Sequence, residues 1–163
     1  MERKLCTIFA LDVVSYSKLR AKDEATTLKP LNKRRKFIDA LIAEYEGRIF
    51  NTAGDSVLAE FTSPVRALEC AIQIQNNSQA LNNIADDNNA MSFRIGINIG
   101  DVMVSDDNLF GDAVNIAARL EAEAIVDGIC ISQSTFDMVN LRVKVSYEDA
   151  GELDLKNIDR PIK

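Results

Sequence analysis

The sequence contains no histidine, and its three cysteines form no C-x-x-C motif. The lack of histidine excludes serine and cysteine triads with a histidine base, and zinc sites with histidine ligands. Cys6, Cys70 and Cys130 are far apart in the sequence, which favours buried thiols in a reducing compartment over a disulfide framework. Any chemistry must therefore use carboxylates, amides, lysine, arginine or bound metal.

Excess positive charge and long apolar runs are also absent. The net charge of −6 argues against a nucleic-acid partner or direct contact with an anionic membrane. No apolar run approaches a membrane span, and Asp12 interrupts the apolar segment 5–11 without a signal-peptide cleavage site. We expect one domain spanning residues 1–163 and a cytoplasmic location, with any membrane tether elsewhere in a full-length protein.

Strand-like and helix-like segments alternate along the chain. The clearest strand is 93–99, where apolar and other residues alternate. Pro30 is expected to start a new helix or kink the first one. We expect strands at 4–12, 48–52, 56–61, 93–99, 129–131, 143–147 and 153–155, and helices at 23–45, after Ser63-Pro64, at 110–124 and at 132–139. This order predicts an α+β fold, a ferredoxin-like (palm-type) α/β sandwich whose helices cover a mostly antiparallel sheet.

Two aspartates lie at predicted strand ends. Asp12 ends the first strand, and Asp55 lies in a glycine turn between two others. Such a carboxylate pair suits Mg²⁺, which completes its shell with water and substrate phosphates. Two ions about 3.5–4 Å apart can activate a nucleophilic oxygen and stabilise the leaving one. Taken singly, however, each residue is better explained as a helix cap or a turn aspartate.

A predicted helix carries a second polar pair. Asn115 and Arg119 are four residues apart, so they share one helix face. Arginine offers a fixed fork of donors to phosphate oxygens, and asparagine can orient a sugar or ring oxygen. Segment 13–17 follows the first strand, where backbone N–H groups can cradle phosphate. A solvated helix surface and a simple connection explain these features better when each is taken alone.

Four segments together are far more specific. They are 9–17 (FALDVVSYS), 48–56 (RIFNTAGDS), 93–101 (FRIGINIGD) and 110–119 (FGDAVNIAAR). The set resembles the class III nucleotide cyclases, the catalytic domains of adenylate and guanylate cyclases, in the family's order and at its usual separations. Segment 151–157 is similar to the family's late hairpin, so the resemblance covers nearly the whole chain.

The resemblance implies a metal site and a phosphate site. Asp12, Asp55 and the carbonyl of Val13 match the ligands of two Mg²⁺ or Mn²⁺ ions per site. Residues 13–17, which include Val14, Ser15, Tyr16 and Ser17, match the loop that holds the triphosphate. Lys156 is a weaker match to a further triphosphate contact.

The resemblance also implies a reaction and an assembly. The expected activity is conversion of ATP to 3′,5′-cyclic AMP and pyrophosphate, in intracellular signalling. Asn115 matches a residue near the ribose, and Arg119 one on the phosphates, and both stabilise the transition state. Such enzymes form homodimers with shared active sites, in which one subunit supplies the aspartates and the other supplies Asn115 and Arg119.

Two asparagines occupy the positions that read the purine in the resembled family. Adenylate cyclases often have lysine at the position of Asn51 and aspartate or threonine at that of Asn108, whereas guanylate cyclases have glutamate and cysteine. A carboxamide both donates and accepts hydrogen bonds, so it can match adenine or, flipped, guanine. We therefore expect weak base discrimination, with ATP as the main substrate and a guanylate or mixed-specificity cyclase as the alternative.

Asn51, Asn108 and a further departure, Ser15, leave an alternative of another class. Ser15 stands where the family usually has glycine, and the chain stops at Lys163, where the family continues into another strand. The alternative is a nucleotide-binding regulatory domain without turnover, but the intact pairs Asp12/Asp55 and Asn115/Arg119 argue against it. We expect an excised catalytic domain whose full-length protein carries a regulatory domain.

Overall fold

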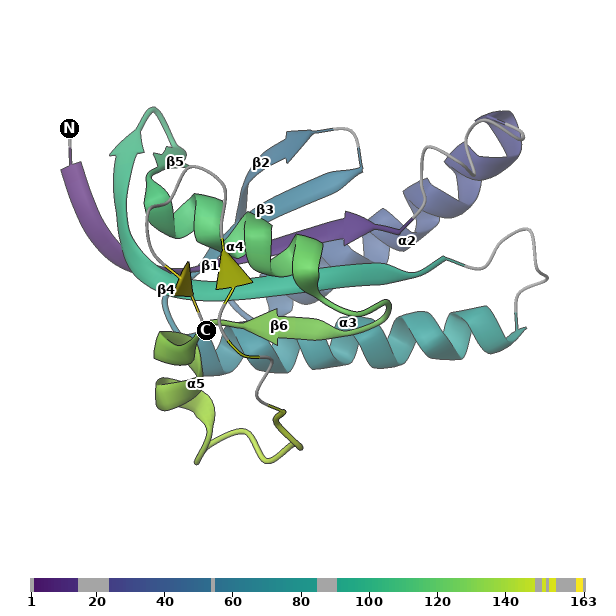
Figure 1. Ribbon diagram of the computed structural model, residues 1–163. Helices are drawn as coiled ribbons and strands as arrows, with labels where there is room; N and C mark the ends of the chain where they lie inside the picture. Colours follow the sequence, from purple (N-terminus) through teal and green to yellow (C-terminus); the bar gives the residue numbers. More distant parts are fainter. Residues whose placement is uncertain are drawn as a thin grey trace.

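The computed structural model describes residues 2–14, 24–53, 55–84, 91–148, 151, 153–154 and 161–162. A six-stranded sheet forms its centre (Figure 1), in the order β2-β3-β1-β4-β5, with β6 beside β4. Only the β4–β6 pairing in this sheet is parallel, so the predicted mostly antiparallel sheet is confirmed. The strands are β1 Glu2–Val13, β2 Arg48–Ala53, β3 Ser56–Phe61, β4 Phe93–Ser105, β5 Asn108–Phe110, β6 Ile129–Ile131, β7 Leu153–Asp154 and β8 Pro161–Ile162. The helices are α2 Glu24–Glu44, α3 Pro64–Ile84, α4 Asp112–Glu123 and α5 Gln133–Val139.

The two faces of the sheet carry separate apolar cores. On one face, the side chains of alternate β1 residues such as Phe9 and Leu11 pack with α2, α3 and α5. On the other, Ile8 and Ala10 pack with the inner side of α4. Successive side chains of β1 therefore point to opposite faces and contribute to both apolar cores. In Figure 1, α4 lies on one face of the sheet, whereas α2 and α3 lie across the other. None of the helices within the described segments is long and apolar enough to cross a membrane.

Three local predictions differ from the structure. The expected strand at 143–147 is wrong, because the Tyr147 hydroxyl donates to the Val143 carbonyl at 2.7 Å and the ring packs edge-on against Phe136. The new helix expected at Pro30 does not form, since α2 runs through it, while the alternative of a kink at Pro30 stays a prediction. The helix expected from residue 110 begins at Asp112, because residues 108–110 pair with β4 instead.

Gly96 sets the close approach of α4 to the sheet. A Cβ atom at this position would lie 2.3 Å from the Glu121 nitrogen and 2.4 Å from the Ala117 oxygen, both of them backbone atoms of α4. Only glycine therefore permits the observed contact. The amide of Asn98, two residues along β4, donates to the Ala113 carbonyl at 3.2 Å and fastens the first turn of the helix.

We expect Gly96→Ala to destabilise the protein by about 3 kcal/mol, because the helix backbone would have to move away from the sheet. For a chain of this size that lowers the melting temperature by roughly 5–10 °C, measurable by circular dichroism. Gly100→Ala is the milder comparison: its nearest contact would be the Ala113 Cβ at 2.9 Å, against 2.3 and 2.4 Å to backbone atoms at Gly96, so a smaller loss is expected. An equal loss in both variants would contradict the backbone contact as the cause.

Candidate active site

The sheet brings Asp12 and Asp55 together. β1 pairs with β3 up to Leu11 opposite Val57, so Asp12 lies beside the start of β3. The β2–β3 turn that contains Asp55 directly precedes Ser56, the first residue of β3. The prediction that strand ends bring the two aspartates together is therefore confirmed in geometry: Asp12 lies within β1, next to its last residue, and Asp55 lies in the β2–β3 turn.

Electrostatics confirm how close the two carboxylates lie. Burial, and then the charge and carboxyl oxygens of Asp55, raise the pKa of Asp12, while the Val13 N–H and the Ser56 side chain act to lower it. The Val13 N–H donates to Asp12 Oδ1 at 2.9 Å. Arg94, the cross-strand neighbour of Asp12, donates from Nη1 to the Ala122 carbonyl of α4 at 3.1 Å. A half-buried pair of carboxylates is a donor set that fits a divalent metal.

Asn115 and Arg119 lie on the opposite side of α4. The inner side of this helix buries Ala113, Ala117 and Leu120, whereas Asn115 is exposed and Arg119 is half-buried. No hydrogen bond or ion pair between described residues links either side chain to Asp12 or Asp55. The chain thus presents the two halves of the predicted site, without bringing them into contact.

The predicted phosphate loop is described only in part. Val13 ends β1, and the Val14 N–H donates to the Ser92 carbonyl at 2.9 Å, so this backbone donor is already used. Ser15, Tyr16, Ser17 and Lys156 lie outside the described residues.

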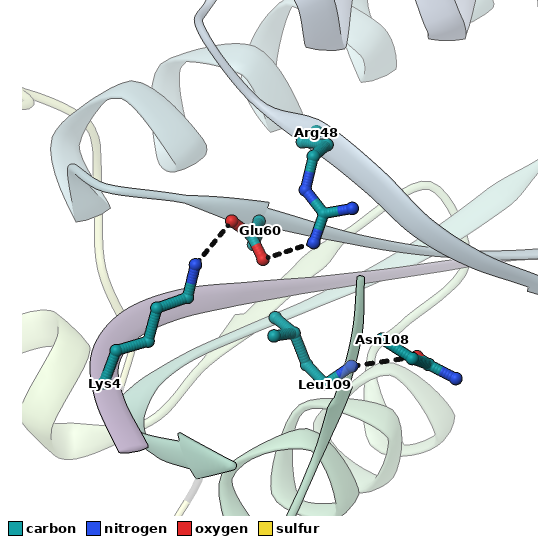
Figure 2. Close-up of polar contacts among 5 residues, drawn as sticks. All are labelled: Lys4, Arg48, Glu60, Asn108 and Leu109. Carbon is teal, nitrogen blue, oxygen red and sulfur yellow. Dashed lines mark hydrogen bonds and ion pairs between the residues drawn. The ribbon is translucent and has the colours of Figure 1, made fainter. Parts of the chain in front are cut away.

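The two asparagines of the base prediction come from β2 and β5, which approach one another. Asn51 is exposed and Asn108 is half-buried. Asn108 Oδ1 accepts a hydrogen bond from the Leu109 N–H at 2.9 Å (Figure 2). Because a backbone N–H can only donate, this contact fixes which end of the Asn108 amide carries the oxygen.

Sequence analysis missed two charged residues near the aspartates. Glu121 lies on the inner side of α4 and is only 9% exposed. Arg94 is the cross-strand neighbour of Asp12, and its Nε atom lies 3.6 Å from Glu121 Oε2. One sequence feature could have indicated Glu121: it lies at helical spacing from Val114 and Ala117, on the apolar side of the helix that should face the sheet.

Comparison with known proteins agrees with this geometry. The sequence profile of the adenylate and guanylate cyclase catalytic domain matches residues 2–162. A crystal structure of an adenylate/guanylate cyclase/hydrolase from Silicibacter pomeroyi superposes with a TM-score of 0.92 and 41% identity, covering 99% of this chain and 94% of that one.

Curated relatives are longer than this chain. "Putative adenylate cyclase 3" of Rhizobium meliloti (strain 1021) is 40% identical over 163 residues, which are 99% of this chain and 28% of that protein. An adenylate cyclase of Streptomyces coelicolor is 30% identical over 132 residues, covering 80% of this chain and 33% of that protein. The chain thus spans about a third or less of either relative.

Proposed function

The chain belongs to the adenylate and guanylate cyclase catalytic domain family, and from that premise we propose that it converts ATP to 3′,5′-cyclic AMP and pyrophosphate. The observation that carries this proposal is the proximity of Asp12, near the end of β1, to Asp55, in the turn that precedes β3. The proposed site is shared by two copies of the chain, because Asn115 and Arg119 face outward from α4.

In the proposed site, Asp12, Asp55 and the Val13 carbonyl hold two Mg²⁺ or Mn²⁺ ions. Bound ions would lower the pKa of the ribose 3′-hydroxyl and neutralise phosphate charge. Ser15, Tyr16, Ser17 and Lys156 are the proposed triphosphate contacts, whereas the Val14 N–H already donates to the Ser92 carbonyl.

The partner copy supplies the groups that stabilise the transition state. Asn115 orients the ribose, and Arg119 donates to the phosphoryl oxygens as negative charge accumulates there. The 3′-oxygen forms a bond to the α-phosphorus and loses its proton to solvent, while the bond to the leaving pyrophosphate breaks. No histidine base is needed for this reaction, which agrees with a chain that has none.

Support for ATP comes from the relatives named adenylate cyclase. Asn51 and Asn108 are the proposed base contacts. With its oxygen held by the Leu109 N–H, Asn108 offers its –NH₂ group to an acceptor on the base. Adenine offers ring N1 and guanine offers O6, so this donor admits both purines. GTP is therefore the alternative substrate.

Purified protein, given ATP and GTP in parallel with Mn²⁺ or Mg²⁺, tests the proposal. We expect cyclic AMP as the main product and a smaller yield of cyclic GMP, both quantified by chromatography. Asp12→Ala is the control and should yield neither product. A clear preference for GTP would overturn the choice of substrate. Metal-dependent nucleotide binding with no cyclic product would indicate a regulatory domain instead.

A further inference from the structure

Glu121 is a buried acid that the proposed reaction does not use. Its residue is nine-tenths buried, yet its Oε2 atom has no hydrogen-bond partner among the described residues. The nearest opposite charge is Arg94, whose Nε atom lies 3.6 Å away, beyond hydrogen-bond distance. A buried carboxylate left in this state needs an explanation, because leaving such an oxygen without a partner costs free energy.

Arg94 connects Glu121 to the strand that lies beside Asp12. It is paired across β1 and β4 with Asp12 itself. Its Nη1 atom donates to the carbonyl of Ala122, at 3.1 Å, in the last turns of α4. Arg94 is thus fixed to the helix backbone, and this one residue lies both across from Asp12 and 3.6 Å from the Glu121 carboxylate.

Glu121 lies within electrostatic range of the aspartates, beside the arginine that is paired with Asp12. Burial, and next the charge of Asp12, raise the pKa of Glu121 to about 7; Arg94 acts to lower it and Asp55 to raise it. Three acids from β1, the β2–β3 turn and α4 therefore converge. No three acidic, cysteine or histidine residues of the described segments are close enough to hold one ion together. Glu121 consequently lies outside the inner ligand shell.

We propose that Glu121, held by Arg94, is a positioning residue of the divalent-cation site that acts from the outer shell. Its negative charge stabilises the bound cation, either by orienting Asp12 and Asp55 or by accepting a hydrogen bond from a water on the cation. Glu121 thereby couples the cation site to α4. The inference rests on the proposed function for the existence of the cation site. The competing explanation is a buried ion pair that only fastens α4 to the sheet.

The chain offers a matched control pair on the same sheet. Glu60 is also mostly buried, with a side chain 15% exposed against 11% for Glu121. It accepts from Lys4 at 2.9 Å and from Arg48 at 3.0 Å (Figure 2), across β1, β3 and β2. Both oxygens of Glu60 thus have cationic partners of their own. Neutralising Glu60 therefore shows how much the Mn²⁺ affinity changes when a mostly buried ion pair away from the proposed cation site is removed.

The experiment measures Mn²⁺ affinity of the whole chain, without nucleotide, by electron paramagnetic resonance. We expect Glu121→Gln to weaken Mn²⁺ binding about tenfold, as loss of an outer-shell partner does. Glu121→Asp keeps the charge and should recover part of that loss. Glu60→Gln should leave the Mn²⁺ affinity at the wild-type value. Thermal unfolding of the metal-free variants gives their stability separately.

Unchanged Mn²⁺ affinity in Glu121→Gln, with wild-type binding intact and lost in Asp12→Ala, would overturn the inference and leave the proposed function standing. If the wild-type chain itself binds no Mn²⁺, the cation site of the proposed function fails, and the inference with it. If Glu121→Gln does not fold, Glu121→Asp carries the test. A weakened affinity in that variant supports the inference, and an unchanged one refutes it.

Discussion

Subunits with Asp12→Ala and subunits with Arg119→Ala should each be inactive, but their mixture should regain about a quarter of the wild-type activity. Asp12→Ala removes a proposed metal ligand, and Arg119→Ala should lower kcat by about 10³-fold, as loss of a phosphate-stabilising arginine does. Random exchange makes half of the dimers mixed, and each mixed dimer has one site with every residue present. The measurement is cyclic AMP formation over a series of mixing ratios.

The outward orientation of Asn115 and Arg119 is the reason for this expectation. The control is a mixture of Asp12→Ala with Asp55→Ala, whose defects lie in the same half of the site and cannot complement one another. Subunit exchange is followed independently by mass-tagged chains. The division of the site between two copies is wrong if the first mixture exchanges subunits and yet recovers no more activity than the control.

A second large effect is expected on stability when Mn²⁺ is added. At one hundred times its dissociation constant, a ligand that binds only the folded state stabilises it by about 2.7 kcal/mol. For this chain length the melting temperature should rise by roughly 5–10 °C. Asp12→Asn should abolish that rise, because the remaining carboxylate of Asp55 holds the ion poorly. The measurement is differential scanning calorimetry with and without Mn²⁺.

The same variant should be more stable than the wild type when no metal is present. The folded-state pKa of Asp12 is raised, mainly by burial and by Asp55, so folding disfavours its charged form. The associated stability is present at low pH and is lost as the pH rises through the folded-state pKa. The gain from Asp12→Asn should therefore appear at neutral pH and vanish in acid.

Asp101→Asn on β4 is the matched control, because Asp101 is exposed and belongs to the same sheet. It should keep the Mn²⁺ effect and show no gain in stability. Metal-free Asp12→Asn protein that melts below the wild type at neutral pH would contradict the repulsion between Asp12 and Asp55.

The sequence predicted the strand ends of the site because short-range patterns determine them. Asp12 lies near the end of an apolar strand and Asp55 lies in a turn, as the patterns indicate. Their proximity depends on the pairing of β1 with β3, which no local pattern contains. The resemblance to a family supplied that long-range information.

Arg94 and Glu121 could not be related to the site from the sequence for the same reason. Alternation in β4 assigns Arg94 to the side opposite Phe93, but only the register with β1 places it across from Asp12. Helical spacing puts Glu121 on the same side of α4 as the buried residues Val114 and Ala117. The sequence therefore indicates that Glu121 faces the sheet, but it does not indicate that Arg94 is its partner.

The predicted strand at 143–147 failed because alternation alone does not create a partner strand. Apolar residues occupy alternate positions 143, 145 and 147, which is the pattern of a strand. In the structure Val143 is buried and Tyr147 is half-buried, but Val145 is exposed. The hydrogen bond from the Tyr147 hydroxyl to the Val143 carbonyl closes this segment on itself. Side chains of the right type can thus pack against α5 without sheet pairing.

The exposure of Asn51 and the local hydrogen bond of Asn108 bear on how such a domain can evolve. Neither side chain belongs to the apolar clusters, and Asn108 is satisfied by its neighbour's backbone. Replacing either one removes no core packing, so mutations at the proposed base contacts carry little penalty for folding. The contact of Gly96 with the α4 backbone has no such freedom. Nucleotide preference can therefore drift by single substitutions while the scaffold beneath it stays fixed.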